Sequence, residues 1–193
     1  MNERPYEVAH LDELDRHPLD DEGLLWRPVR RKLGITAFGT NAYTAEKGTE
    51  RVVEEHTEEK DGNEELYFVA SGRATFVLGD DEVDAPAGMF VHAEPGTRRG
   101  AVATEPGTTV LAIGAKPGVP YEIRRATPRE EWLDVDDVLA AELHERLARL
   151  GFHGELLDAF IAYTYMENLE DCVDGIEQID PVVLEALRSR SPT

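Results

Sequence analysis

The fold is decided by EELYFVASG at residues 64–72 and PAGMFVHAEPGTRR at residues 86–99, which follow EEHTE at residues 54–58. These stretches are rich in β-branched and aromatic residues and are closed by glycine or proline turns, a pattern typical of short β-strands. No helical period separates one stretch from the next. The middle of the chain is therefore predicted to be all-β.

Working outward, similar segments fill the chain from about Leu24 to Ile123, and turns such as SG at 71–72 and EPG at 105–107 separate them. Short, evenly spaced strands without intervening helices favour a closed barrel or jelly roll over a parallel sheet. The expected strands are Trp26–Val29, Leu33–Tyr43, Arg51–His56, Glu65–Ala70, Arg73–Leu78, Glu82–Val83, Met89–Ala93, Arg99–Thr104, Thr108–Gly114 and Tyr121–Arg124.

The quoted stretches resemble the two signature motifs of the cupin superfamily. The spacing from Glu65 to Gly72 and from Gly88 to Gly96 matches those motifs. The resemblance implies a mainly β fold, a cupin-type double-stranded β-helix or jelly-roll barrel. In metal-binding members, two histidines, a glutamate and a closing histidine converge inside the barrel on iron, manganese, nickel or zinc.

This chain departs from the metal motif at two positions. His56 and Glu65 fit the first histidine and the acid, but Glu58 stands at the second histidine and Arg99 at the closing one. A guanidinium is always protonated and has no lone pair for a metal. We therefore expect Arg99 to pair with Glu58 or Glu65 in a degenerate, metal-free site that binds a small polar ligand.

Several alternatives remain open from the sequence. Tyr67 could close the pocket or belong to the core, and alternation does not decide whether Arg98 or Arg99 faces inward. His92 is either a core histidine or a substitute ligand in a His56, Glu65 and His92 metal site. With that set, or with Glu58, the protein would be a metal-dependent cupin enzyme of the dioxygenase or isomerase type.

From Thr127 onward the period changes from two to 3.6 residues. Leucines at 139, 143, 147 and 150 form one helical stripe before Gly151, residues 156–161 mark a second helix, and Asp180-Pro181 opens a third. ELHERLARLGFHG at 142–154 and VDGIEQIDPVVLEAL at 173–187 resemble small three-helix peptidoglycan-binding-like modules. A glycan or a protein is the partner that this module could take, and an interaction scaffold is a third functional alternative.

The expected organisation is an N-terminal arm at 1–24 with a short helix over Val8–Arg16, a barrel at 25–124 and a helical module at 128–193. Cupins commonly pair by exchanging N-terminal strands, and the Trp26–Tyr43 segment is long enough to do so. The resemblance therefore implies a homodimer.

Composition narrows the partners further. With 40 acidic and 20 basic residues the formal net charge is −20, which disfavours binding to nucleic acid and to anionic membranes. No apolar stretch is long enough to cross a bilayer, and the N-terminus lacks the apolar core of a signal peptide. The single Cys172 cannot form an internal disulfide and is expected to be a buried or half-buried structural thiol. These features predict a cytoplasmic protein.

Overall fold

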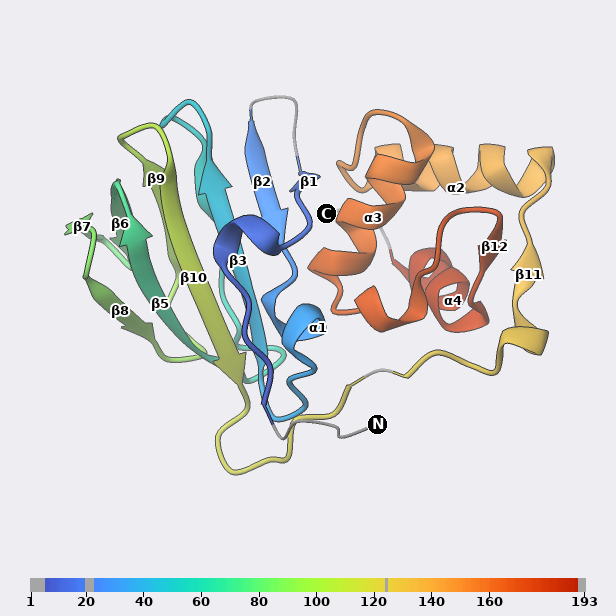
Figure 1. Ribbon diagram of the computed structural model, residues 1–193, viewed down its shortest axis with the longest axis horizontal. Helices are drawn as coiled ribbons and strands as arrows, with labels where there is room; N and C mark the ends of the chain where they lie inside the picture. The colour runs from blue at the N-terminus through green and yellow to red at the C-terminus, as the bar shows by residue number, and fades with distance from the viewer. Residues whose placement is uncertain (1–5, 20–22, 124, 191–193) are drawn as a thin grey trace. The chain divides into compact units, whose positions relative to one another are not determined.

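The computed structural model describes residues 6–19, 23–123 and 125–190. They form two compact units, residues 1–122 and 123–193. The first unit holds the β-strands of a barrel and the second is mainly helical (Figure 1). No helix in the described ranges combines the length and apolar character that crossing a bilayer requires.

The barrel consists of two antiparallel sheets that face each other (Figure 1). One sheet has the order β1-β2-β3-β10-β5-β8 and the other β4-β9-β6-β7. From β3 to β10 this is the strand order of a jelly roll, the closed double-sheet architecture of cupins. The strands are β1 (His17–Pro18), β2 (Leu24–Arg27), β3 (Gly39–Ala45), β4 (Arg51–His56), β5 (Glu64–Ser71), β6 (Arg73–Leu78), β7 (Asp81–Pro86), β8 (Phe90–Ala93), β9 (Arg99–Ala103) and β10 (Thr108–Ala115).

Alternation along these strands builds the barrel core. On β5, Tyr67 and Val69 are buried, whereas their neighbours Leu66 and Phe68 lie on the outer face and are only half-buried. Tyr67, Val69 and Phe76 belong to one apolar cluster that both sheets contribute to. Glu65 has the same parity as Tyr67, so its carboxylate is directed to the inner side of the sheet. The fold thereby places an acid among core residues.

The N-terminal part differs from the sequence-based prediction in two places. The helix expected over Val8–Arg16 is reduced to the 3₁₀ turn η1 (Leu11–Glu13). The strand expected over Leu33–Tyr43 is wrong in its first half, because α1 (Val29–Leu33) intervenes and ends at Gly34 in the left-handed conformation (φ 62°). No strand includes residues 121–123, and Arg124 lies outside the described residues.

The second unit contains the three helices that the apolar period predicted: α2 (Asp137–Arg149), α3 (Leu156–Met166) and α4 (Pro181–Ser189). The Asp180 side chain accepts a hydrogen bond from the Val182 N–H at the start of α4, as the Asp-Pro pair indicated. Cys172 is buried in this unit, which confirms the structural reading of the thiol. Its remaining elements are η2 (Arg129–Glu131), β11 (Leu133–Asp134), η3 (Glu170–Cys172) and β12 (Gln178–Ile179).

Candidate functional site

Strand register assembles five of the predicted site residues in the barrel. His56 ends β4 and Arg99 begins β9, and the two are direct cross-strand partners. Glu65 and Tyr67 lie two residues apart on β5 and therefore share its inner face. Glu58 lies in the loop that follows β4, and its backbone N–H donates to the carbonyl of Pro95 at 2.9 Å. We call His56, Glu58, Glu65, Tyr67 and Arg99 the barrel cluster.

One oxygen of Glu65 is the centre of the barrel cluster. The Tyr67 hydroxyl donates to Oε2 at 2.5 Å, and Arg99 Nε donates to the same atom at 2.9 Å. His56 Nε2 lies 3.3 Å from it. The predicted pairing of Arg99 with a glutamate is confirmed for Glu65. Tyr67 belongs to the core, one of the two alternatives that the sequence left open, and its hydroxyl also binds the Glu65 carboxylate.

Arg99 is completely buried, with 0 % of its side chain exposed. Its Nη1 donates to the carbonyls of Pro95 at 3.2 Å and Thr97 at 2.8 Å. Nη2 lies 2.8 Å from Glu65 Oε2 but forms no hydrogen bond there, so a buried donor is left unsatisfied. Arg98 instead is partly exposed and pairs with Glu55 at 3.2 Å. The register thus decides which arginine faces inward.

The solvent-facing part of the cluster is formed by His56 and Glu58. His56 has 33 % of its side chain exposed, and its Nε2 lies 3.7 Å from Glu58 Oε1. Asn63 donates to the other Glu58 oxygen at 2.7 Å, and the His56 Nδ1 atom lies 2.8 Å from the Glu54 carbonyl. Both side chains are therefore oriented by neighbours while part of each stays open to solvent.

These contacts shift the protonation of the cluster. The hydrogen bond to Glu65 raises the pKa of His56, although burial opposes it. Burial raises the pKa of Glu65, but hydrogen bonds from His56 and Tyr67 and the charge of Arg99 outweigh it, and the pKa lies below its ordinary value. Burial raises the pKa of Glu58. Burial and the Glu65 charge raise the pKa of Tyr67, so its phenol stays a donor.

The cluster contains a set of atoms that could hold a cation. One nitrogen of His56 and one oxygen each of Glu58 and Glu65 lie within 4.8 Å of one another. Imidazole and carboxylate ligands suit iron, manganese, nickel or zinc. However, Glu65 Oε2 already binds the guanidinium of Arg99, a fixed positive charge that repels a neighbouring divalent ion. The side chains therefore fit a cation by ligand type, but the Arg99 charge offsets one of the two carboxylates.

The structure does not bring His92 into this cluster. His92 pairs with Leu66 across β5 and β8, whereas Glu65 pairs with Ala93, so His92 and Glu65 point to opposite faces. The His92 ring is half exposed and lies 3.3 Å from Glu64 on the outer side. Both of its predicted roles, a core histidine and a substitute metal ligand, are therefore wrong.

Two asparagines near the cluster were not predicted. Asn63 orients Glu58, as described above. Asn41 lies on β3 in register with Ala112 of β10, which in turn pairs with Tyr67, so the three residues share the inner face. The Asn41 Oδ1 atom is buried without a hydrogen-bond partner. Alternation with Tyr43 within the predicted strand could have placed Asn41 inside the barrel.

Comparison with known proteins covers both units. Residues 123–187 match the family model described as "Putative peptidoglycan binding domain". No curated protein matches the chain as a relative. Similar solved structures include a cupin protein from Bacteroides fragilis, with 18 % identity, 60 % of this chain and 87 % of that chain covered, and a TM-score of 0.45.

Two other similar structures are described by an activity. A predicted oxalate decarboxylase from Thermotoga maritima has 17 % identity and a TM-score of 0.46. The aligned region covers 57 % of this chain and 99 % of the decarboxylase chain. A sugar phosphate isomerase of the cupin superfamily from Silicibacter pomeroyi has 19 % identity, coverages of 57 % and 76 %, and a TM-score of 0.48. At such identities, shared architecture does not carry activity from one protein to another.

The strand order and the inward acid together assign the first unit its fold. The chain joins a cupin-type jelly-roll barrel to a C-terminal helical unit that resembles peptidoglycan-binding modules over residues 123–187.

Proposed function

We propose that the barrel binds a small polar ligand at the barrel cluster without a resident metal ion. The observation that carries this proposal is the fully buried Arg99 guanidinium bound to Glu65 Oε2. Two unit charges about 4 Å apart interact by about 4 kcal/mol in a partly solvated protein site, and a divalent ion doubles that repulsion. A cation at Glu65 would have to overcome this repulsion or displace Arg99.

The side-chain groups of the barrel cluster that remain available indicate which kind of ligand could bind. The His56 ring is partly exposed, but its two nitrogens already contact the Glu54 carbonyl and Glu65, whereas Glu58 offers a carboxylate oxygen 3.7 Å from the ring. Arg99 has no exposed surface and its Nη2 lies 2.8 Å from Glu65 Oε2, so a ligand would meet this pair at the Glu65 carboxylate, whose side chain is 17 % exposed. A small polar molecule with a hydrogen-bond donor, such as a hydroxyl, for the Glu58 carboxylate meets this requirement. Proteins with a net charge of −20 repel anions at long range, so such a ligand is held by these local contacts.

A metal-dependent enzyme of the dioxygenase or isomerase type is the second candidate. The arrangement of His56, Glu58 and Glu65 favours it, because one ligand atom of each lies within 4.8 Å of the others, a set that could hold a divalent ion. This alternative needs Arg99 to leave Glu65 when the ion binds. The two candidates therefore differ in one measurable quantity, the metal content of the purified protein.

The test compares wild-type protein, purified without added metal, with Arg99→His. Elemental analysis is expected to find iron, manganese, nickel and zinc far below one ion per chain in the wild type. Arg99→His supplies the missing imidazole and removes the repelling charge, so it is expected to bind zinc or nickel at least about 100-fold more tightly.

Arg99→Met is the matched control, since it removes the charge without adding a ligand. It should gain less affinity than Arg99→His. Near-stoichiometric metal in the wild type that His56→Ala abolishes would overturn the metal-free proposal in favour of the enzyme. Native mass spectrometry of the same wild-type sample would show whether a small organic molecule is retained instead.

A further inference from the structure

The chain that follows β10 returns to the barrel through a short segment, residues 116–121, which we call the strap. It begins with a tight turn, in which Gly118 is left-handed (φ 70°) and the Val119 N–H donates to the Lys116 carbonyl at 3.3 Å. Figure 1 shows this segment, in yellow, leaving β10 and reversing its direction. The residues of the strap before Tyr121 are exposed, whereas Tyr121 is half-buried. The turn therefore brings this one ring back to the barrel.

The Tyr121 hydroxyl lies over a pair of glycines inside the barrel. Gly39 of β3 and Gly114 of β10 are cross-strand partners, and they lie two residues from Asn41 and Ala112, so all four share the inner face. A Cβ atom placed on Gly39 would lie 3.3 Å from the Tyr121 hydroxyl oxygen and 3.7 Å from Cε2. The ring thus uses space that a larger side chain at Gly39 would fill.

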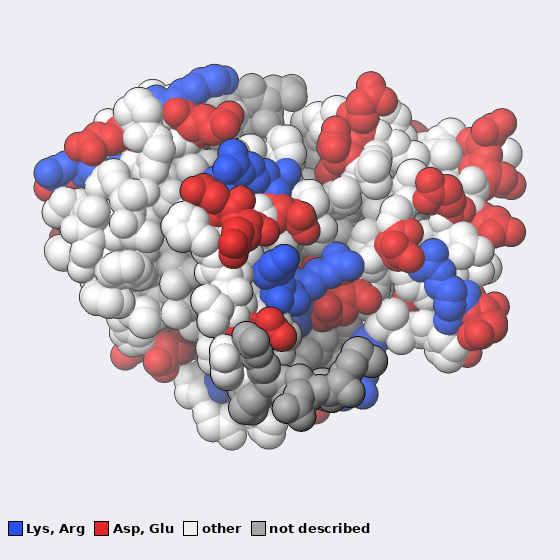
Figure 2. All heavy atoms as spheres, viewed as in Figure 1, with Lys and Arg blue, Asp and Glu red and all other residues white. Residues whose placement is uncertain are grey.

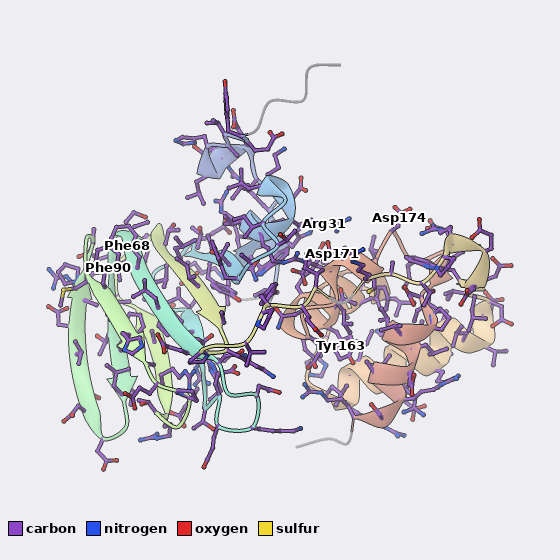
Figure 3. All side chains as sticks on the ribbon, turned by 90° about the horizontal axis from the view of Figure 1, so that it is seen from below. Arg31, Phe68, Phe90, Tyr163, Asp171 and Asp174 are labelled. Carbon is purple, nitrogen blue, oxygen red and sulfur yellow. The ribbon has the colours of Figure 1, made fainter. Side chains whose placement is uncertain are left out.

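The glycine pair belongs to the same cross-strand row as Glu65. Gly114 pairs with Glu65 across β10 and β5, and a Cβ atom on Gly114 would lie 3.4 Å from Glu65 Cγ and 3.7 Å from Oε1. Phe68 and Phe90 have the opposite parity and lie together on the outer face (Figure 3). The Tyr121 hydroxyl and the Glu65 carboxylate therefore lie on the inner face, on either side of Gly114.

Hydrogen-bond acceptors lie in this row and in the next one. Every neighbour that contacts the Glu65 carboxylate does so at Oε2, so Oε1 receives no hydrogen bond from the residues that the structure describes. In the next row, Asn41 Oδ1 is buried without a partner. A buried acceptor without a donor costs free energy. A ligand hydroxyl that passes the Tyr121 ring could donate to either oxygen.

We propose that Tyr121 determines the width of the molecules that reach Glu65 and Asn41 from the β3–β10 side of the barrel. The strap holds the ring at the open end of the barrel, where the glycines make room for it. A narrow molecule with a hydroxyl passes beside the ring, whereas a bulky one requires the strap to move. This inference rests on the proposed function, because it concerns which ligands enter the same site.

A cysteine placed beyond the ring measures this access without a known ligand. Ala112→Cys puts a thiol on the inner face, one row beyond the glycine pair. The reagents should be neutral, because the net charge is −20 and acidic side chains lie on the surfaces of both units (Figure 2). N-methylmaleimide and N-benzylmaleimide share one reactive group and differ in width. Peptide mass spectrometry gives each rate at residue 112 and separates it from any reaction at the buried Cys172.

In the Ala112→Cys chain, N-methylmaleimide is expected to react at residue 112 at least about tenfold faster than N-benzylmaleimide. Adding Tyr121→Ala should bring the two rates within about twofold, whereas Tyr121→Phe keeps the ring and should preserve the difference. Val119→Ala is the matched control on the strap, because Val119 is 55 % exposed. Val102→Cys, on the outer face of β9, corrects for the intrinsic reactivity of the two reagents.

Two rates that are already equal in the Ala112→Cys chain would overturn the proposal, as would a difference that Tyr121→Ala leaves unchanged. Equal effects of Tyr121→Ala and Val119→Ala would also overturn it, because the ring would then not be the limiting group. Circular dichroism verifies that the variants are folded. The metal content that tests the proposed function does not enter these rates, so either proposal can fail while the other stands.

Discussion

Asp180 and Thr164 of the helical unit and Arg99 of the barrel are buried polar side chains that are held in different ways. In the helical unit, Asp180 is buried because it caps α4, and Thr164 because its hydroxyl bonds to the Phe160 and Ile161 carbonyls of its own helix. In the barrel, Arg99 and Glu65 instead bind each other from different strands. The backbone of the helix explains why Asp180 is buried. It does not explain the burial of the Arg99–Glu65 ion pair, in which Arg99 Nη2 forms no hydrogen bond.

The ion pairs of the two units show the same difference. Glu142 on α2 binds Arg188 on α4 at 2.7 Å, and the hydrogen bonds from Arg188, followed by those from Arg146, lower the pKa of Glu142 to about 2. These groups remain partly exposed, so their contribution to stability is small. In the Arg99–Glu65 pair, the Arg99 side chain is fully buried and only 17 % of the Glu65 side chain is exposed. We therefore interpret the Glu142–Arg188 pair of the helical unit as structural and the Arg99–Glu65 pair of the barrel as part of a candidate site.

The largest effect is expected from breaking the buried pair. Arg99→Met leaves the Glu65 carboxylate in the barrel without its cation and should lower the free energy of unfolding of the barrel by about 3–5 kcal/mol. Urea unfolding of single-tryptophan variants measures this, because Trp26 lies in the barrel and Trp132 in the helical unit. The Trp26 transition should move and the Trp132 transition should not.

Arg98→Met is the matched control, since Arg98 is the exposed neighbour that pairs with Glu55. Its loss is expected to stay below about 1 kcal/mol. The double change Arg99→Met with Glu65→Leu should recover part of the stability, because an apolar pair of similar volume can replace a buried ion pair. Equal losses for Arg98→Met and Arg99→Met would show that burial does not distinguish the two arginines.

An intermediate effect is expected at the buried cap of the helical unit. Asp180 accepts hydrogen bonds from Val182 N–H at 2.9 Å and from the Thr127 N–H at 2.8 Å. Asp180→Ala removes both acceptors and should destabilise the helical unit by about 2 kcal/mol. The Trp132 transition in urea reports this loss.

The control is Asp136→Ala, which removes the exposed cap of α2. Asp136 accepts a single hydrogen bond from Leu139 N–H at 2.8 Å, so a loss of about 1 kcal/mol is expected. A loss at Asp136 as large as that at Asp180 would contradict the distinction between a buried and an exposed cap.

Local signals made part of this structure predictable. Arg51–His56 and Arg73–Leu78 have the bounds read from apolar alternation and turn glycines, and α4 begins where Asp180-Pro181 indicated. The short helix α1 was missed, because its five residues are too few to show a helical period beside a strand-like neighbour.

The site required information that a single strand does not contain. Alternation alone does not say whether Arg98 or Arg99 faces inward; the pairing of His56 with Arg99 across β4 and β9 decides it. The misplacement of His92 has the same origin. Its face depends on the register of β8 with β5, where a slip of one residue reverses every side chain. The spacing of the motifs was enough to predict which residues form the barrel cluster. Their orientation depends on the register between strands that are far apart in the sequence.

The smallest effect is expected from the pH dependence of the barrel's stability. The hydrogen bond to Glu65 raises the pKa of His56, so the protonated ring stabilises the fold below about pH 6.5, its ordinary pKa, and this contribution is lost as pH rises through the raised value. The pKa of Glu65 is lowered in the folded barrel, where hydrogen bonds from His56 and Tyr67 outweigh the effect of burial. Its contribution is therefore present above the ordinary glutamate pKa and is lost as pH falls through the lowered value.

The Trp26 urea midpoint should therefore fall on the alkaline side of the His56 titration, and His56→Gln should remove that fall. NMR titration of the ring gives the pKa directly, and Glu65→Gln should lower it, because the variant removes the charge that favours the protonated ring. A His56 pKa that Glu65→Gln leaves unchanged would mean that the ring does not bind this carboxylate in solution. The Glu65 carboxylate would then be available to another ligand on the side where the cluster opens to solvent. That result would favour a bound metal ion over the metal-free binding of a polar ligand.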